Sequence, residues 1–228
     1  MTTQPTVTVH LMRHGEVDNP EGVLYERLDG FGLTERGREM TALTARWLAT
    51  ENRDIAMIMS SPLQRAQESA APAAEIFQLP IFTDSRLTEA GNKLRGQKIH
   101  RSPLTLASPR YWPLYVAPWL PSWGEHYRDI AQRMFRAVAH ARALTPPGRE
   151  SLVVSHQLPI WTLRRFVEGK SLVHDPRKRE CALASVTSFY FDNATLIGLD
   201  YASPAESLVA QSQDVTPGSS SAAVNTGR

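Results

Sequence analysis

The chain has 228 residues, of which 42% are hydrophobic, and this length suits one α/β domain with a sizeable core. Its 25 Lys and Arg against 23 Asp and Glu give a formal net charge of +2, so a strongly basic surface for nucleic acid is not expected. Cys181 is the single cysteine, which excludes an intrachain disulfide framework and a multi-thiolate zinc site.

Targeting signals are not evident in the sequence. Residues 1–5 lack the basic and apolar stretches of a secretory signal, and no later segment is apolar for long enough to cross a bilayer. We therefore expect a cytoplasmic protein without a membrane partner. One domain is predicted over 1–210, with an insertion over 91–124. From 211 to 228 the composition turns to Ser, Gly, Thr and Asn, which predicts a flexible tail.

The first elements alternate between strand and helix. An apolar strand is expected over 7–12, followed by a helix from about 34 to 49 with Thr34 as its N-cap. A second strand over 54–60 precedes a helix over 63–77, for which Ser61 is the expected cap. This order indicates strands joined by crossover helices.

The second half of the chain continues the alternation. A short strand is expected over 81–83, a helix over 125–144, a strand over 151–155 and a helix over 158–168. Strands over 185–191 and 195–201 are separated by turn-forming residues, which predicts a hairpin. The whole order predicts an α/β fold whose sheet is mostly parallel and contains an antiparallel element.

Cationic and imidazole side chains stand where three of these strands end. Arg13 and His14 follow the first strand, Arg65 comes shortly after the second, and His156 follows the strand over 151–155. Ligands of open α/β sheets bind at the carboxyl ends of parallel strands, so these four side chains are expected to converge on one anion. Helix N-termini after residues 61 and 156 would add N–H donors. The pattern predicts a phosphate site.

These residue types suit phosphoryl transfer. A neutral imidazole attacks phosphorus without first losing a proton, so His14 is the candidate nucleophile, its other ring nitrogen donating to a carbonyl such as that of Gly15. Arg13 and Arg65 present planar forks for phosphoryl oxygens. His156, held protonated by the bound dianion, would supply a further donor.

The ester oxygen that leaves needs a proton, and Glu89 is the candidate donor. Glu16 and Glu125 are the alternatives, although both could instead be hydrogen-bonding struts, since carboxylates are common on surface loops.

Other polar residues are weighed as substrate contacts or as surface. The candidate contacts are Asn19, Gln157, Glu16, Tyr25 and Arg27. Residues 177–179 are interpreted as a solvated charge run. The remaining histidines are interpreted as structural or surface residues, namely His10, His100, His126, His140 and His174. No helix carries paired histidines and no carboxylates cluster, so neither a metal nor a cofactor is expected.

Six ordered segments resemble the histidine phosphatase superfamily, also called the phosphoglycerate mutase-like family. They are 11–16 (LMRHGE), 33–37, 60–66, 86–89, 124–125 and 153–156. The resemblance implies a three-layer α/β/α sandwich and a covalent phosphohistidine at His14. It further implies a phosphate pocket of Arg13, Arg65 and His156, with Glu89 as proton donor. The chain departs from the family pattern where Asn19 is displaced by one position and where Gln157 replaces the usual glycine.

The expected function is that of a metal-independent phosphomonoesterase acting on a small phosphate ester through a phosphohistidine on His14. A phosphoglycerate mutase is the first alternative, but the mutase continuation after the acid is missing because Ala90, Gly91 and Asn92 follow Glu89. A catalytically quiet phospho-ligand-binding or regulatory protein is the second.

The insertion over 91–124 interleaves cations with aromatic residues. It is expected either to select the substrate by capping the site or to fill a satellite core. Its tryptophans, if partly exposed, would form an apolar surface, and on this ground a homodimer is a further hypothesis.

Overall fold

The computed structural model describes residues 6–92, 95–96 and 124–212. At its centre is a six-stranded sheet of order β3-β2-β4-β1-β5-β6. The strands are β1 (Val7–Arg13), β2 (Ile55–Ser60), β3 (Ile81–Thr83), β4 (Glu150–Ser155), β5 (Val186–Asp192) and β6 (Thr195–Ala202). The first four strands are parallel, and β5 is antiparallel to both β1 and β6. The predicted sheet, mostly parallel with an antiparallel element, is confirmed.

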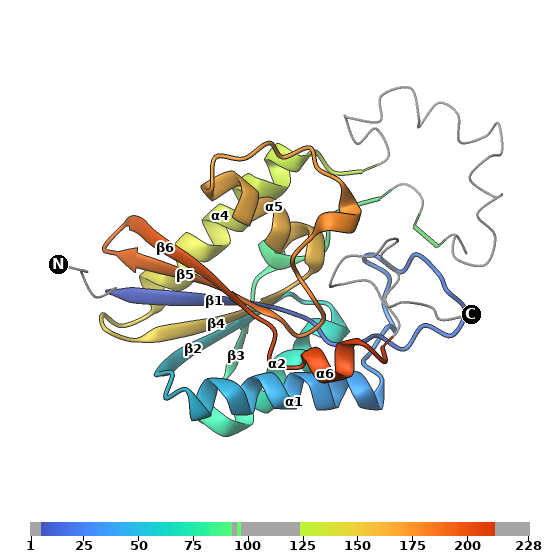
Figure 1. Cartoon of the computed structure of the whole chain (residues 1–228), viewed down its shortest axis with the longest axis horizontal. Coiled ribbons are helices and arrows are strands. Elements are labelled where there is room, and N and C mark those ends of the chain that lie inside the picture. Colours follow the sequence, from blue (N-terminus) through green and yellow to red (C-terminus); the bar gives the residue numbers. More distant parts are fainter. Residues whose placement is uncertain (1–5, 93–94, 97–123, 213–228) are drawn as a thin grey trace.

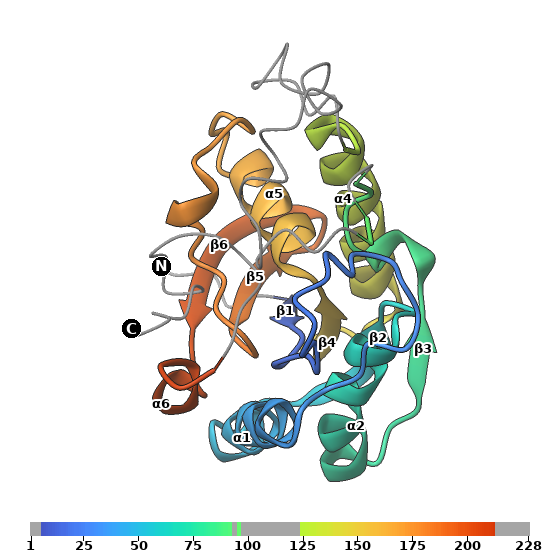
Figure 2. The same ribbon diagram turned by 90° about the vertical axis from the view of Figure 1, so that its right-hand side faces the viewer.

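Helices cover both faces of the sheet and make three layers (Figure 1). One face carries α4 (Tyr127–Leu144) and α5 (Gln157–Val167), and the other carries α1 (Glu35–Thr50), α2 (Gln64–Phe77) and α6 (Glu206–Val209). The turned view in Figure 2 places the strands between these two helical layers. The sequence does not predict α6, because four residues are too few to display a helical period.

The core has two sides because successive strand residues point to opposite faces. On one side, β1 and β2 contribute Leu11 and Met59 to a cluster with Met134 of α4. On the other side, Met12 and Ile58 pack with the residues of α1 and α2. Burial on both faces explains why β2 is an almost continuous apolar run, and in β1 it extends to the polar residues Thr8 and His10.

The helix starts agree only partly with the predicted caps. Thr34 caps α1 as predicted, since its hydroxyl oxygen accepts from the Gly37 N–H at 2.9 Å. The prediction for Ser61 is wrong, because Leu63 is the N-cap residue of α2 and makes no side-chain cap. The Ser61 hydroxyl lies 2.9 Å from Nε2 of His156, and it also accepts a long hydrogen bond from the Leu63 N–H at 3.4 Å.

Two predicted segments fall largely outside the described residues. Most of the 91–124 insertion does, including the tryptophans behind the homodimer hypothesis, and so does the tail from 213 onward. The two ends of the insertion are paired, since Asn92 and Gly124 form a β-bridge and the Glu125 N–H donates to the Gly91 carbonyl at 2.9 Å. Within the described part of the chain, no helix combines the length and the apolarity needed to cross a membrane.

Candidate active site

The register of the sheet places the two histidines side by side. Strand β1 pairs with β4 so that Arg13 stands opposite Ser155, and the His14 N–H donates to the Ser155 carbonyl at 3.2 Å. His14 follows Arg13 and His156 follows Ser155, so the two histidines are neighbours at the ends of adjacent strands. Their ring centroids are 5.2 Å apart. Parallel pairing alone thus brings together two residues that are far apart in the sequence.

Two buried arginines join the imidazoles. Arg13 is 2% exposed at the end of β1, and Arg65 is 1% exposed in the first turn of α2. Arg13 donates to the Cys181 carbonyl at 2.8 Å, and Arg65 donates to the Glu26 carbonyl at 2.5 Å. Both guanidinium groups lie near enough to lower the pKa of each imidazole by their charge. The four side chains thus form one cationic cluster.

The protonation state of His14 follows from its contacts. Its Nδ1 lies 2.8 Å from the Gly15 carbonyl, which can only accept, so Nδ1 carries the hydrogen and Nε2 holds the lone pair. Burial, followed by the charges of Arg65 and Arg13, holds the pKa of His14 well below its usual value. The imidazole is therefore neutral at pH 7, and the predicted bond to Gly15 is confirmed.

His156 and Arg65 have buried nitrogens without hydrogen bonds. Among the described residues, neither Nδ1 of His156 nor Nε of Arg65 has a partner. Burial is the main cause that lowers the pKa of His156, so this imidazole is also neutral in the protein alone. Its protonation by a bound dianion stays a prediction. Orphaned buried nitrogens are costly, and an oxyanion would satisfy both.

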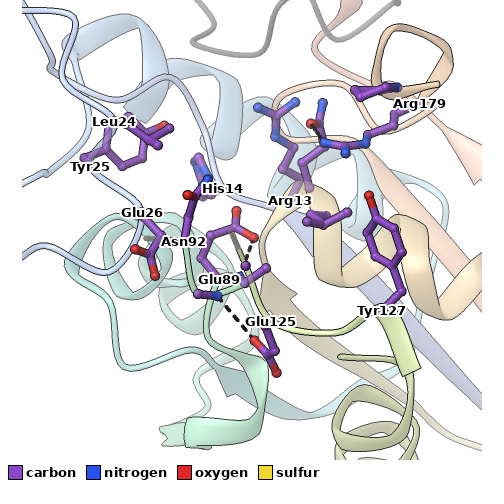
Figure 3. Close-up of a pocket in the computed structure, with 16 residues that line it drawn as sticks. Arg13, His14, Leu24, Tyr25, Glu26, Glu89, Asn92, Glu125, Tyr127 and Arg179 are labelled. Carbon is purple, nitrogen blue, oxygen red and sulfur yellow. Dashed lines mark hydrogen bonds between the residues drawn. The ribbon is translucent and has the colours of Figure 1, made fainter. Parts of the chain in front are cut away.

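A cavity of about 320 Å³ opens over His14 and Arg13 (Figure 3). The predicted residues Tyr25, Glu89 and Gln157 line it as well. A small phosphate ester would fit such a space, and its phosphoryl group would meet Arg13 and His14. The other two members of the cationic cluster, Arg65 and His156, are buried at 1% and 0% exposure and are not among the residues that line the cavity.

Glu89 presents its carboxylate to this cavity. Its Oε1 accepts from the Ala90 N–H at 2.7 Å, and its backbone carbonyl accepts from Nε of Arg27 at 2.7 Å. Arg27 is not among the residues that line the cavity, so its contact with Glu89 positions the carboxylate rather than touching the contents of the cavity.

Glu125 is held as a strut. Its two oxygens accept from Arg133 at 2.7 Å and from Arg27 at 2.8 Å. Burial raises the pKa of Glu125, but the hydrogen bond and charge of Arg133 outweigh burial and leave it below the usual range. A carboxylate that stays ionised in this way is a poor proton donor.

Glu16 and Asn19 are not brought to the cavity over His14. They line a separate surface pocket together with Arg36. Glu16 accepts from the Thr34 hydroxyl at 2.6 Å, and the Asn19 amide closes a turn by bonding both the N–H and the carbonyl of Val23. Both side chains therefore hold the loop that follows His14, which differs from the substrate contacts predicted for them.

Three charged or aromatic residues that line the cavity are among those that the sequence analysis missed. Arg179, interpreted as part of a solvated charge run, is one of them, and Glu26 and Tyr127 are the others. Burial raises the pKa of the Glu26 carboxyl, although the Asn92 N–H and the charge of Arg27 oppose this effect. Arg179 shares its charge and context with the exposed Arg177 and Lys178, so no local signal distinguishes it.

No group of three or more His, Cys, Asp or Glu that could hold a metal ion occurs in residues 6–92, 95–96 and 124–212.

Substitution of Gly37 by alanine is expected to disturb the His14 loop. Alanine normally favours a helix, but here its Cβ would lie 2.1 Å from the Glu16 carbonyl oxygen. Because this oxygen belongs to the backbone, relieving the clash requires the chain itself to shift. We expect a loss of about 1–3 kcal/mol in unfolding free energy together with reduced phosphate binding. The control is Gly198→Ala, whose Cβ would meet only the Tyr190 side chain at 3.4 Å. Urea unfolding measures both variants, and equal stability of the two would contradict the close approach.

The neutral histidines also predict a pH-dependent stability. The pKa values of His14 and His156 are lowered in the folded state, so below about pH 6.5 the unfolded chain binds more protons and folding becomes less favourable. Each histidine contributes a slope of up to about 1.4 kcal/mol per pH unit as the pH falls below that point. Urea unfolding between pH 7.5 and 5.5, without phosphate, should give a flatter profile for the His14→Ala, His156→Ala double variant. A profile as steep as that of the wild type would contradict the assignment.

Known proteins resemble this chain along most of its length. The uncharacterized protein Rv0525 of Mycobacterium tuberculosis is 49% identical over 197 residues, which are 86% of this chain and 96% of the relative. The solved mycobacterial glucosyl-3-phosphoglycerate phosphatase Rv2419c, in complex with VO3, is 26% identical with a TM-score of 0.69, over 86% of this chain and 98% of that one.

A partial match points to a second activity among the relatives. A 2,3-bisphosphoglycerate-dependent phosphoglycerate mutase of Thermoplasma acidophilum is 40% identical over 90 residues, which are 39% of this chain and 44% of the mutase. The sequence model of the histidine phosphatase superfamily (branch 1) matches residues 9–199, which include all six strands except the first two residues of β1 and the last three of β6. On the strength of this match, the chain belongs to the histidine phosphatase superfamily, branch 1.

Proposed function

We propose that the protein is a phosphomonoesterase that hydrolyses a small phosphate ester through a phosphohistidine on His14. The observation that carries the proposal is the state of this imidazole. It is neutral, its Nδ1 is held by the Gly15 carbonyl, and it lies within a cluster of two buried arginines and a second histidine. A nucleophile with a lone pair beside cations that bind oxyanions is what phosphoryl transfer requires.

In the first half of the proposed reaction, Nε2 of His14 attacks phosphorus and the bond between phosphorus and the ester oxygen breaks. Glu89 gives its proton to that oxygen, so the alcohol leaves neutral. Arg13 and Arg65 hold the phosphoryl oxygens and stay charged while negative charge redistributes. His156 adds a hydrogen bond from Nδ1, the nitrogen that lacks a partner.

In the second half, water attacks the phosphohistidine and gives a proton to the Glu89 carboxylate. The phosphorus–nitrogen bond breaks, inorganic phosphate forms, and the electron pair returns to Nε2 of His14. Glu89 is then protonated again for the next turnover, so acid and base are one group used in alternation.

A phosphoglycerate mutase is the second candidate, and the partial match to the Thermoplasma mutase favours it. Hydrolysis is preferred because Ala90, Gly91 and Asn92 follow Glu89 where a mutase has its extended motif. Similarity over the whole fold to a phosphatase supports the same choice.

Phosphate release from a panel of alkyl and aryl phosphates, with a chelator present, tests the proposal. A metal-independent phosphatase releases phosphate from several esters. A mutase instead interconverts phosphoglycerates and needs a bisphosphoglycerate primer, and a binding protein does neither although it binds phosphate. Either of the last two outcomes would replace the proposal.

A further inference from the structure

Besides Arg13, a second arginine lines the cavity over His14, and the proposed reaction does not use it. Arg179 follows a short 3-10 turn, η4 (Pro176–Lys178), and its side chain reaches toward Arg13 across the cavity (Figure 3). Among the described residues, Arg179 bonds only to neutral groups and forms no ion pair with a carboxylate. Arg13, the other arginine in the cavity lining, differs in that it already belongs to the phosphoryl cluster.

Neutral partners hold the Arg179 side chain on two sides. Its Nε donates to Nε2 of His174 at 2.9 Å, and a terminal nitrogen donates to the Gln157 amide oxygen at 3.1 Å. His174 can accept because its Nδ1 lies 2.7 Å from the Leu172 carbonyl and must carry the hydrogen. The guanidinium is thus positioned without being neutralised.

The surroundings of His174 keep it in the accepting state. Its ring lies against Tyr127 and Trp161, with centroid distances of 5.5 and 6.2 Å. Burial is the main cause that lowers the pKa of His174 to about 4, and the charge of Arg179 acts in the same direction. At pH 7 the imidazole is therefore neutral and keeps its bond to Arg179.

Among the described residues no carboxylate forms an ion pair with Arg179, although Glu89 lies near enough for its charge to raise the pKa of Arg179. Burial lowers the pKa of Arg179, and the charge of Arg13 adds to this effect, yet a guanidinium stays protonated in proteins. A phosphoryl dianion would be matched by the charges of Arg13 and Arg65. Arg179 lies outside that pairing and bonds to no carboxylate, so it would gain from a second anion on the ligand.

We propose that Arg179 binds a second anionic group of the substrate, so that the substrate class is a small phosphate ester whose leaving group carries a carboxylate or another phosphate. This inference rests on the proposed function. His174 and Gln157 are positioning residues for the guanidinium. The size of the cavity restricts the ligand to a small molecule.

A matched series of three-carbon esters tests this assignment. Hydroxypropyl phosphate has a neutral end, phosphooxypropanoate has a carboxylate in its place, and propanediol bisphosphate has a second phosphate. For Arg179→Gln, the ratio of kcat/KM for an anionic ester to kcat/KM for the neutral ester should fall about 10- to 100-fold, the usual value of one charge-assisted hydrogen bond. Whichever anionic ester, the carboxylate or the bisphosphate, shows the larger decrease in this ratio identifies the anionic group that Arg179 binds. Arg179→Lys, which keeps the charge but loses the fork, should fall less.

Lys178→Gln is the control, because it removes the same charge from an exposed neighbour. Its ratio should stay within about threefold of the wild type, as expected for a screened surface charge. An unchanged ratio in Arg179→Gln overturns the proposal. An equal fall for neutral and anionic esters also overturns it, because Arg179 would then serve the scissile phosphoryl group or the fold.

Binding separates this proposal from the proposed function. Calorimetry should give the wild type a preference of about tenfold or more for phosphooxypropanoate or propanediol bisphosphate over hydroxypropyl phosphate, and Arg179→Gln should lose it. If no ester is hydrolysed but this preference is present, the proposed function fails and the anion site stands. If the wild type has no preference, the anion site fails whatever the activity, and this result does not depend on the folding of any variant.

Discussion

His14→Ala is expected to lower kcat for every phosphate ester by about 10⁴-fold or more, because the variant lacks the imidazole nitrogen that attacks phosphorus in the proposed reaction. The remaining cluster of Arg13, Arg65 and His156 can still bind phosphate. Loss of turnover with retained binding is therefore the expected result. Phosphate release measures the first quantity and calorimetry with inorganic phosphate measures the second.

The covalent intermediate gives this prediction a second measurement. Wild-type protein quenched during turnover should carry an acid-labile phosphate on His14, and His14→Ala should carry none. His140→Ala is the matched control, because this exposed histidine on α4 lies outside the cavity. Labelling of His14→Ala, or more than about 1% residual activity, would exclude His14 as the nucleophile.

Glu89→Gln is expected to act according to the leaving group. For alkyl phosphates, loss of the proton donor should lower turnover by about 10²- to 10⁴-fold. Nitrophenolate needs no proton to leave, so nitrophenyl phosphate should still phosphorylate His14 rapidly. Because the same variant lacks the base for the second half, one equivalent of nitrophenol should appear in a burst, followed by slow turnover.

Stopped-flow absorbance records that burst, and Glu125→Gln is the contrasting variant. Glu125 anchors Arg27 and Arg133, so its loss should slow alkyl and aryl esters by similar factors. If Glu89→Gln slowed both classes equally and gave no burst, Glu89 would be a positioning residue and the proton would come from another group.

The strands, and the polar residues at their ends, could be predicted from the sequence. A short and largely apolar run such as 7–12 is typical of a strand buried on both faces, and parallel strands end at the same edge of the sheet. The placement of His14 beside His156 follows from these two facts. The capping role of Thr34 could be predicted as well, because a helix cap depends on atoms only three residues apart.

The positions of the loop side chains could be predicted only in part. Tyr25 and Glu89 reach the cavity as expected, but Glu16 and Asn19 turn toward Thr34 and Val23. A loop residue chooses between a local turn and a distant pocket by small differences in free energy, and both choices suit the same polar side chain. The residue types therefore predicted a polar role without predicting its place.

The sequence by itself determined the α/β order, the strand-end positions of the site and the family, because these depend on periodicity and on short ordered motifs. The tertiary structure alone decided that Ser61 bonds His156 instead of capping a helix, and that Arg179 faces the cavity while Lys178 faces solvent. Each of these outcomes depends on segments about 20 to 100 residues apart meeting in space. Such meetings are fixed by packing of the whole core, which no local pattern of residues records.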